Sequence, residues 1–567
     1  MRSWRVNLIF AILIIFGAAI ISRLFFLQII NHKFYQAQAL GQQTVFEEVE
    51  GARGEIFFKD NTKSLAVNND KWLLYVTPQE IENKEEAAEI LSKIIKEQKD
   101  QILSKIEEGD SYTVIKNKLT DEEFNEIKNL VNSTELQRGD SKLKGIYLDR
   151  LPGRYYPQEK IAASVVGFVG GEGIGQYGLE GYYEEILKGK KSFKEEPRNL
   201  ILFDPEKLEP TSLDGSDLYL TIDYSIQFEA ESLLKEAKEK FGIDSGQIIV
   251  IEPTTGRIMA MADYPSFNPN QYSKEKDISI FQNSSVQKIF EPGSVMKPIT
   301  MAIALNQGKI TPDTTYKDEG FVKVGVETIY NFNKTKKYGI QTMTQVLEKS
   351  LNTGAVFVSR LIEPSIYIKY LDDFGLGEKT GIDLQGEVYS RNENLRNGKE
   401  INFATASFGQ GIEMTPIQLV DAFCVIANGG KLVKPYFVEK VVNAQREETE
   451  INPKIIKEVI NQQTVSQLTS MLISAVENGF AKQAKVPGYY VAGKTGTAQV
   501  PYEDRKGYYP NKTIHSFVGF APALNPKFVI LVKLDNPKGK SSAETAALTF
   551  SKLAQYILNY LQIPPDH

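Results

Sequence analysis

A long apolar segment near the N-terminus places the strictest limit on how this chain can fold. Residues 6–30 are almost entirely apolar, with polar interruptions at Asn7, Ser22, Arg23 and Gln28. This length fits a helix that crosses a lipid bilayer, with Arg23 directed to the interface or packed against a partner helix. Two arginines precede the segment, so we expect the N-terminus in the cytoplasm and the rest of the chain outside.

The alternative is a cleaved signal peptide, because the residues at 37–39, Ala-Gln-Ala, resemble a cleavage site. The apolar segment is longer than that of a typical signal peptide. We therefore expect a protein anchored in the cytoplasmic membrane by a single pass, with its folded part extracytoplasmic.

Composition excludes several other classes of protein. A chain of 567 residues predicts two or three domains. The net charge of −6 gives no basic surface for nucleic acid. One cysteine, Cys424, rules out an internal disulfide, and three histidines scattered along the chain do not suggest a metal site. We expect no metal ion and no cofactor.

The order of patterns predicts where the domains begin and end. Two short strands are expected within 54–68, charged helices within 81–135, and a polar, proline-containing linker over 188–216. The predicted organisation is a cytoplasmic stub (1–5), a transmembrane helix (6–30), a pedestal or dimerisation-type domain (31–210) and a larger domain (211–567).

The larger domain alternates helix and strand patterns in a way that predicts an α+β fold. A strand near 218–223 precedes a helix over 226–241, and two apolar runs flank a Pro-Thr-Thr-Gly turn at 253–256, which predicts a hairpin. Several helices follow, then three strands after residue 489 and a helix over about 542–561. This order favours a central antiparallel sheet flanked by helices.

The residues from 290 to 305 are the first candidate for chemistry. Pro292 and Gly293 form a turn, and Ser294 would begin a buried helix in which Lys297 returns to the same face. A serine hydroxyl is a weak nucleophile until a neighbouring base takes its proton, and Ser-x-x-Lys supplies both groups. Pro298 cannot donate to the Ser294 carbonyl, which should loosen the first turn.

Two other Ser-x-x-Lys matches show that this pattern is not decisive alone. They begin at Ser273 and Ser285, both in a polar stretch that we interpret as solvated loop. Later motifs must distinguish Ser294 from them.

Ser350-Leu-Asn352 is the second element of the candidate site. It lies in a predicted helix-to-loop transition and offers a hydroxyl for proton relay and a carboxamide that can hold a substrate amide. A similar Ser-x-Asn at 266–268 precedes Ser294 in a loop rich in proline and asparagine, so we reject it.

The third element is Lys494-Thr495-Gly496-Thr497 on a predicted strand. Lys494 would attract a carboxylate, Thr495 and Thr497 would hydrogen-bond to it, and Gly493 and Gly496 would leave room for a ligand backbone. A second Lys-Thr-Gly at 379–381 lacks the surrounding apolar strand, so the later copy is preferred.

The ordered set Ser-x-x-Lys, Ser-x-Asn, Lys-Thr-Gly is typical of penicillin-interacting serine enzymes. Over nearly its whole length the chain resembles the class B penicillin-binding proteins, which are peptidoglycan D,D-transpeptidases. Landmarks that carry the resemblance include Arg154-Tyr-Tyr-Pro, Gly178-Leu-Glu, Ser407-Phe-Gly-Gln-Gly and Ala492-Gly-Lys-Thr-Gly-Thr. The sequences Glu291-Pro-Gly-Ser and Ser516-Phe-Val-Gly-Phe-Ala-Pro resemble the septal (FtsI-like) type more than the elongation type.

The resemblance implies a fold and a mechanism. The fold is a penicillin-binding transpeptidase (serine β-lactamase-like) domain with an N-terminal pedestal. Ser294 would attack the D-Ala–D-Ala carbonyl of a stem peptide with neutral Lys297 as base, and β-lactams would acylate Ser294. Ser350 would relay a proton to the departing D-Ala. The implied catalytic residues are Ser294, Lys297, Ser350, Asn352, Lys494 and Thr497, and the implied substrate-binding residues are Asn352, Thr495, Gly496 and Thr497.

The resemblance also implies partners and leaves alternatives open. The expected partners are peptidoglycan stem peptides, β-lactams, a membrane SEDS-type glycan polymerase and divisome proteins. The alternatives are an elongation-type transpeptidase, a D,D-carboxypeptidase or β-lactamase-like hydrolase, and a non-enzymatic β-lactam sensor or scaffold. His515 is interpreted as a structural residue at a strand edge, with no chemistry assigned.

Overall fold

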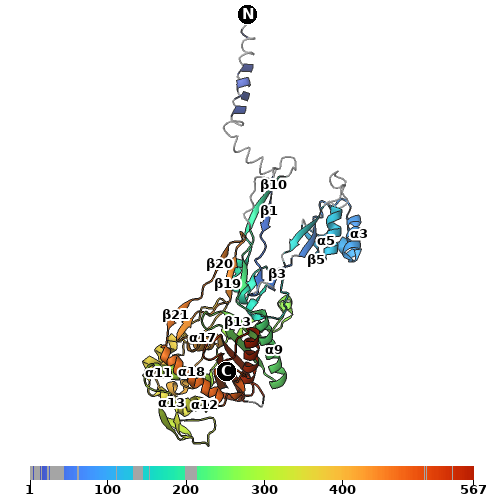
Figure 1. Ribbon diagram of the computed structural model, residues 1–567. Helices are drawn as coiled ribbons and strands as arrows, with labels where there is room; N and C mark the ends of the chain where they lie inside the picture. Colours follow the sequence, from blue (N-terminus) through green and yellow to red (C-terminus); the bar gives the residue numbers. More distant parts are fainter. Residues whose placement is uncertain are drawn as a thin grey trace. The chain divides into compact units, whose positions relative to one another are not determined.

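The computed structural model describes residues 44–567 with the exception of 60–62, 70, 110–111, 132–144, 152, 198–212, 397, 503–504, 506 and 539–540, together with scattered positions between 4 and 25 (Figure 1). The predicted transmembrane segment at 6–30 lies for the most part outside these described residues. Within the described part of the chain, no helix combines the length and apolar character needed to cross a membrane.

The chain divides into two compact units, each described by itself. The first contains residues 1–53 and 188–215. In it, strand β1 (Thr44–Glu50) pairs antiparallel with β10 (Lys191–Pro197), and the Ala52 N–H donates to Asp214 Oδ1 over 2.8 Å. The prediction of a linker over 188–216 is therefore wrong for 191–197. A polar strand such as β10 carries no apolar alternation that distinguishes it from a loop.

The second unit contains residues 54–187 and 216–567, and its central sheet has five strands. All neighbouring pairs are antiparallel. The predicted hairpin is confirmed as its first two strands. In spatial order, the strands are β13 (Ile258–Tyr264), β12 (Ser245–Ile251), β24 (Phe528–Asp535), β23 (Tyr508–Ala521) and β22 (Ala492–Pro501).

Helices cover both faces of this sheet, as the sequence predicts (Figure 1). Ile248 on β12 packs with α9 (Tyr224–Phe241) and α19 (Ala546–Tyr560) in one apolar cluster. The next residue, Ile249, points the other way into a cluster with α11 (Lys297–Asn306), α17 (Pro416–Ala427) and α18 (Gln462–Glu477). Because the central strands are buried on both faces, they read as continuous apolar runs.

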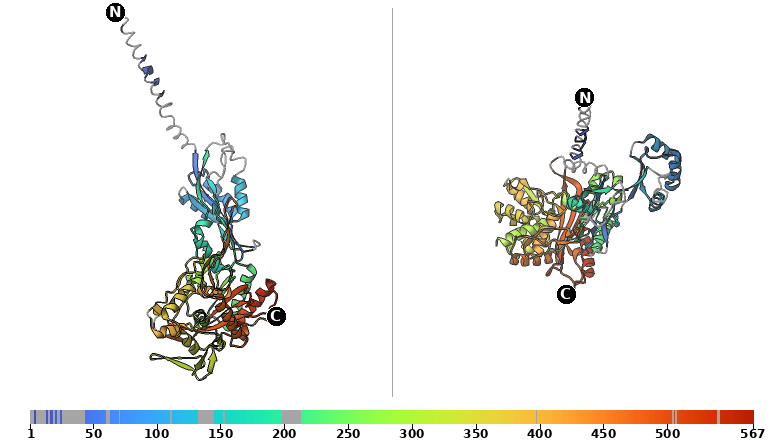
Figure 2. Two further views of the ribbon diagram at one scale, coloured as in Figure 1. Left: turned by 60° about the vertical axis from the view of Figure 1, so that its left-hand side comes forward. Right: turned by 90° about the horizontal axis from the view of Figure 1, so that it is seen from above.

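Further helices of this region lie between β13 and α18 in the sequence. They are α10 (Ser284–Gln287), α12 (Met343–Glu348), α13 (Asn352–Ser359), α14 (Pro364–Asp373), α15 (Glu393–Arg396) and α16 (Glu400–Ala406). Two small ribbons lie between α11 and α12 in the sequence, with strands β14 (Thr315–Asp318), β15 (Phe321–Val324), β16 (Glu327–Tyr330) and β17 (Gly339–Thr342). The helix α19 closes the chain beside the sheet (Figure 2).

A second, six-stranded sheet joins segments from both sides of the predicted boundary at residue 210. Its strand order is β20-β19-β11-β2-β3-β7, and β2 (Ile56–Phe57) pairs parallel with β11 (Asp217–Leu220). The other members are β3 (Ser64–Asn68), β7 (Arg154–Tyr155), β19 (Val438–Val442) and β20 (Glu448–Glu450). A parallel pair formed by segments this far apart leaves no local signal in the sequence.

The region from 71 to 151 forms a three-stranded sheet with three helices. Its elements are β4 (Lys71–Val76), α3 (Lys84–Ile95), α4 (Lys99–Glu108), β5 (Thr113–Leu119), α5 (Asp121–Val131) and β6 (Ile146–Leu151). The predicted helices within 81–135 are confirmed, but β5 interrupts them, so the prediction is wrong for 113–119. That strand pairs with β4, a non-local interaction that outweighs the helical composition around it.

A buried ion pair connects two landmarks of the sequence, Arg154-Tyr-Tyr-Pro and Gly178-Leu-Glu. Arg154 Nε donates to Glu180 Oε1 over 2.7 Å, and Arg154 Nη1 donates to the Gly54 carbonyl over 2.8 Å. The two side chains of the pair are 4% and 0% exposed. Two charges this deeply buried are stable only while both remain, since removal of one leaves the other without compensation.

Glu180→Ala should therefore destabilise the protein, by about 3–5 kcal/mol, because it leaves the Arg154 guanidinium buried without its carboxylate. Chemical denaturation followed by intrinsic fluorescence measures the change. Glu172→Ala, at an exposed position close in the sequence, is the matched control and should stay within about 0.5 kcal/mol of the parent protein. Equal stabilities for the two variants would contradict a structural role for the pair.

Candidate active site

Ser294 lies in a 3₁₀ turn, not in the α-helix that the sequence predicts. The turn η6 (Gly293–Met296) leads directly into α11, which begins at Lys297. In a 3₁₀ turn the side chains at positions i and i+3 eclipse, so Ser294 and Lys297 share one face more closely than in an α-helix. The predicted juxtaposition is confirmed, although the local geometry differs.

The 3₁₀ turn also explains how Pro298 is accommodated. The Lys297 N–H donates to the Ser294 carbonyl, which therefore accepts from three residues ahead and needs nothing from residue 298. Pro298 occupies the first turn of α11, where its missing N–H would have no helical partner in any case. The proline thus favours the tighter turn that carries the serine.

Backbone contacts with the segment that contains Gly409 hold the serine turn η6 in place. Gly293 has a φ of +62°, and its N–H donates to the Gly409 carbonyl over 2.9 Å. A Cβ at Gly409 would lie 2.0 Å from the Gly293 carbonyl oxygen, so only glycine allows this approach. The Ser407-Phe-Gly-Gln-Gly landmark therefore acts by packing against the serine turn.

Three polar side chains, Lys297, Ser350 and Lys494, form a cluster with Ser294. Lys297 Nζ lies 2.9 Å from Ser294 Oγ and 3.1 Å from Ser350 Oγ. Lys494 Nζ lies 3.0 Å from the same Ser350 hydroxyl. The structure thus brings together the three motifs that the sequence singles out, from α11, from the segment between α12 and α13, and from β22.

Ser350 adopts a left-handed backbone conformation to join this cluster. Its φ is +53°, which is unfavourable for a residue with a side chain. The conformation lets both its carbonyl oxygen, 2.7 Å from Lys297 Nζ, and its hydroxyl face the same amine. Strain of this kind is maintained where the surrounding structure fixes it, and it is frequent at functional sites.

Burial sets the protonation of the two lysines. Lys297 is fully buried, and burial together with the charge of Lys494 lowers its pKa well below the usual value. Burial also lowers the pKa of Lys494, to about 7. The lowered pKa favours the uncharged amine form of Lys297, whose lone pair can accept the Ser294 proton.

Strand β22 lies at the edge of the sheet and runs beside the serine turn. A Cβ at Gly496 would lie 2.3 Å from Ser516 Oγ and 3.0 Å from the Pro292 carbonyl oxygen. At Gly493 the ring of Phe517 would be 2.5 Å away. On the side where a Cβ would point, the protein itself therefore fills the space that we expected for a ligand. Gly496 brings the strand close to the segment that leads into Ser294.

The remaining predicted residues lie beside the cluster. Thr495 and Thr497 follow Lys494 on β22, and Thr497 Oγ1 donates to Ser542 Oγ over 3.0 Å. Asn352 begins α13, two residues after Ser350, and its Nδ2 donates to the Tyr330 carbonyl over 3.0 Å. Its amide is thus already held by the ribbon strand β16, and no direct bond joins it to Ser294 among the contacts of the described residues.

The rejected motifs differ from the site in their surroundings. Ser273 is exposed, as predicted, but Ser285 is fully buried in α10, so its interpretation as solvated loop is wrong. Asn283 caps that short helix by accepting from the Ser285 N–H over 3.0 Å, while Lys288 stays exposed. At the second Lys-Thr-Gly, the Thr380 N–H donates to Glu387 over 2.7 Å, which makes this copy a structural loop.

Two residues beside Thr497, His515 and Ser542, are not among the residues predicted for the site. His515 lies opposite Thr497 in the β22–β23 register and is 3% exposed on an inner strand, so the prediction of a strand-edge position is wrong. Its Nδ1 lies 2.9 Å from Thr545 Oγ1, which fixes the turn that presents Ser542 to Thr497. Ser542 lies in a polar loop, and no sequence pattern there predicts its contact with Thr497.

A metal ion has no evident place in the part of the chain that the structure describes. There, no group of three or more histidine, cysteine, aspartate or glutamate side chains is arranged to hold one.

Comparisons with known proteins place this arrangement in a known context. The family profile described as "Penicillin binding protein transpeptidase domain" matches residues 246–555, and "Penicillin-binding Protein dimerisation domain" matches residues 48–200. The first match alone covers more than half of the chain.

Individual relatives and a solved structure agree with the family match. Stage V sporulation protein D of Bacillus subtilis is 34% identical over 500 residues, which cover 86% of this chain and 75% of that protein. Peptidoglycan D,D-transpeptidase FtsI of Buchnera aphidicola is 31% identical over 433 residues, or 75% and 73% of the two chains. Penicillin-binding protein 3 of Mycobacterium tuberculosis, complexed with aztreonam, superposes with a TM-score of 0.69 at 26% identity, over 92% of this chain and 98% of that one.

His515 should make stability fall on acidification. Burial lowers its pKa from 6.5 to about 4 in the folded protein. Between these pH values the unfolded chain binds a proton at His515 that the folded protein does not. The contribution of neutral His515 to the free energy of unfolding is therefore fully present above pH 6.5, and it decreases by about 3 kcal/mol as the pH falls toward 4. Unfolding free energies measured across this range should decline less steeply in His515→Gln. His567→Gln, at the exposed C-terminus, should follow the parent protein; parallel curves for all three would refute the expectation.

Proposed function

This chain belongs to the penicillin-binding protein transpeptidases, and we propose that Ser294 is the nucleophile with which it cross-links peptidoglycan stem peptides as a D,D-transpeptidase. One observation carries the assignment of residues. Ser294 Oγ lies 2.9 Å from the amine of a fully buried lysine whose pKa is lowered well below its usual value. A buried amine in this state is a base next to a hydroxyl, which is the arrangement that nucleophilic catalysis by serine requires.

In the first step, Ser294 Oγ attacks the carbonyl carbon between the two terminal D-alanines of a donor stem peptide. Its proton moves to Lys297 Nζ, and the backbone N–H groups of Ser294 and Thr497 hold the oxyanion. The C–N bond then breaks, and the departing D-Ala nitrogen takes a proton through Ser350, whose hydroxyl lies between Lys297 and Lys494. The result is a Ser294 ester and free D-Ala.

Lys494, Thr495 and Thr497 hold the donor's terminal carboxylate in this proposal, with Gly496 bringing their strand close to Ser294. Binding of the carboxylate stabilises the protonated form of Lys494, whose pKa near 7 leaves it partly uncharged in the free protein. Asn352 holds an amide of the donor peptide. In the second step, an amine of a neighbouring stem peptide attacks the ester and forms the cross-link.

The same nucleophile would serve a D,D-carboxypeptidase or a β-lactamase-like hydrolase, which differ in how water reaches the ester. The match to a dimerisation domain at 48–200 supports a transpeptidase. The lifetime of the acyl-enzyme with a penicillin distinguishes a transpeptidase from a hydrolase, because rapid turnover would indicate a hydrolase. A β-lactam sensor or scaffold would acylate but would produce no cross-links.

We propose a septal role, in keeping with relatives named FtsI. The similarity to Stage V sporulation protein D makes wall synthesis during sporulation a second candidate. Depletion in the source cell distinguishes them. Filaments indicate division, rounded cells indicate elongation, and defective spores with normal growth indicate sporulation.

The apolar segment 6–30 supports a membrane anchor with the enzyme outside the cell membrane. In a septal enzyme, this span and the pedestal are where a SEDS-type glycan polymerase and divisome proteins would bind. The association is tested by chemical cross-linking of this protein to a co-expressed partner in membranes, with residues 6–30 of this protein present or deleted.

Ser294→Ala should abolish covalent labelling by a fluorescent penicillin, because the ester oxygen is removed. The mass of the intact protein, measured before and after exposure, reports the adduct. Ser273→Ala, which alters the exposed Ser-x-x-Lys match, is the control and should label like the parent protein. Labelling of Ser294→Ala at the parental rate would overturn the nucleophile assignment.

Lys297→Met should separate catalysis from stability. Loss of the base lowers the acylation rate constant by about 10²–10⁴-fold. The folded protein should lose no more than about 1 kcal/mol, or gain, because an apolar side chain replaces a fully buried amine. Stopped-flow acylation and denaturation measure the two quantities, with exposed Lys288→Met as control. A variant that unfolds readily but acylates normally would contradict both expectations.

A further inference from the structure

Thr497 is hydrogen-bonded to a buried serine that the mechanism above does not use. Thr497 is exposed on β22, so its side chain is open to a ligand, whereas Ser542 is only 7% exposed. Thr497 Oγ1 donates to Ser542 Oγ over 3.0 Å, and the described residues offer the Ser542 hydroxyl no other partner. The proton of this buried hydroxyl therefore has no acceptor, which is costly. Reversal of the hydroxyl pair, with Ser542 as the donor, would satisfy that proton, provided that Thr497 has another acceptor.

The turn that carries Ser542 is tied to the sheet by His515. The Thr545 hydroxyl donates its single proton to the Ser541 carbonyl over 3.0 Å. The same hydroxyl can therefore only accept from His515 Nδ1, 2.9 Å away, which places the proton of the neutral ring on Nδ1. His515 Nε2 is then an acceptor for the Thr513 hydroxyl, 3.3 Å away. Neutral His515 thus connects β23 to the turn that leads into α19.

Backbone hydrogen bonds hold the same turn in its shape. The Thr545 N–H donates to the Ser541 carbonyl over 3.1 Å. The Ala547 N–H donates to the Ser542 carbonyl over 3.0 Å. Because the backbone around Ser542 is already ordered, its hydroxyl can bond to Thr497 at little further cost in conformational entropy.

We propose that Ser542 is a positioning residue for recognition of the donor's terminal carboxylate. When the carboxylate binds, both hydroxyls turn, so that Ser542 donates to Thr497 Oγ1 and Thr497 donates to a carboxylate oxygen. The two O–H dipoles then point toward the negative charge, and each strengthens the other in the low dielectric around the buried serine. The inference rests on the proposed transpeptidase function, in which Thr497 helps to hold that carboxylate, and it adds the group that directs the Thr497 hydroxyl.

This arrangement makes Ser542 respond to the charge of the ligand. A carboxylate accepts from Thr497 only after the hydroxyl pair has reversed, and reversal also gives the Ser542 proton its acceptor. An ester at the same position carries no charge, so it gains less from the aligned hydroxyls than a carboxylate does. The contribution of Ser542 should therefore appear when charged and uncharged ligands are compared.

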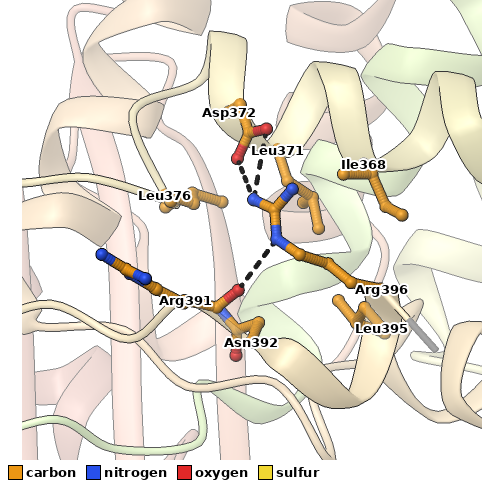
Figure 3. Close-up of a pocket in the computed structure, with 9 residues that line it drawn as sticks. Ile368, Leu371, Asp372, Leu376, Arg391, Asn392, Leu395 and Arg396 are labelled. Carbon is orange, nitrogen blue, oxygen red and sulfur yellow. Dashed lines mark hydrogen bonds and ion pairs between the residues drawn. The ribbon is translucent and has the colours of Figure 1, made fainter.

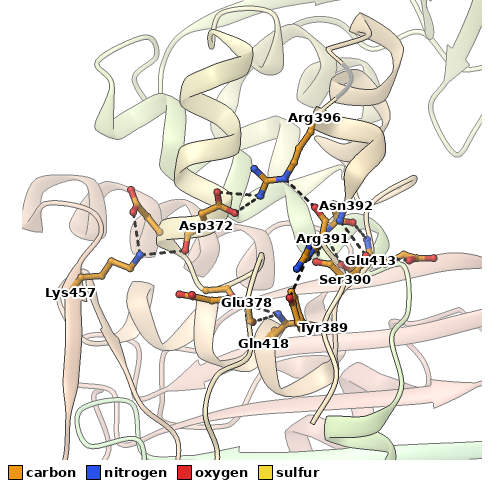
Figure 4. A network of polar contacts seen from close by, with 12 residues as sticks. Asp372, Glu378, Tyr389, Ser390, Arg391, Asn392, Arg396, Glu413, Gln418 and Lys457 are labelled. Carbon is orange, nitrogen blue, oxygen red and sulfur yellow. Dashed lines mark hydrogen bonds and ion pairs between the residues drawn. The ribbon is translucent and has the colours of Figure 1, made fainter.

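A polar network elsewhere in the same unit provides a control for general disturbance of the fold. Arg396 pairs with Asp372 over 3.1 Å and donates to the Arg391 carbonyl over 3.4 Å (Figure 3). Lys457 donates to the Asp372 carbonyl over 3.4 Å (Figure 4). Among the described residues, no hydrogen bond joins these four side chains to the hydroxyl pair. Asp372→Asn therefore alters polar contacts of this unit without reaching the pair.

Acylation of the full chain by benzylpenicillin and by its methyl ester tests the role of Ser542. The two compounds share the β-lactam ring and differ in the charge of the carboxyl group. Ser542→Ala should lower the second-order rate constant of acylation by the free acid about three- to tenfold, the effect of one hydrogen bond between neutral groups. The rate constant for the methyl ester should stay within about twofold of the parental value. Stopped-flow measurements give the ratio of the two rate constants for each variant.

Ser542→Thr keeps the hydroxyl and should restore the parental ratio. Ser541→Ala, at the exposed neighbouring position, and Asp372→Asn should leave both rate constants at the parental values. An unchanged ratio in Ser542→Ala would overturn the proposal, as would a parallel loss with both compounds, which a purely structural role predicts. If neither compound acylates the parent protein, the transpeptidase function fails first and the role of Ser542 with it.

Discussion

The burial of two amines side by side is the constraint on which the rest of this structure depends. Lys297 and Lys494 are 0% and 2% exposed, and both lie within hydrogen-bond distance of the Ser350 hydroxyl. Two ammonium groups could not share such a site, so one must lose its proton. The fold tolerates the cost because Lys297 extends from α11, which is packed into the larger apolar cluster on one face of the sheet. The same burial that costs stability lowers the pKa of Lys297, which its proposed role as the base for Ser294 requires.

Close backbone approach is what brings these groups together. The serine turn, the 409–411 segment and the edge strand β22 contact one another where Gly293, Gly409 and Gly496 have no side chains. A Cβ at Gly409 or Gly496 would separate these segments by moving backbone or a short side chain, not the end of a flexible one. The distances around Ser294 are thus set by contacts several residues away from it. The Ser-Phe-Gly-Gln-Gly landmark contributes to the site by supporting the turn that carries Ser294.

Much of the site was predictable because its chemistry is local in sequence. Ser294 with Lys297 and the Lys494–Thr497 run each occupy one turn or one strand, so their spacing alone indicates a shared face, and the predicted family and sheet are confirmed. What the sequence could not predict depends on non-local contacts. The left-handed Ser350 and the inner position of His515 are imposed by neighbours far along the chain. The parallel pairing of β2 with β11 is also non-local, and the sequence of neither short strand contains a periodicity that identifies its partner.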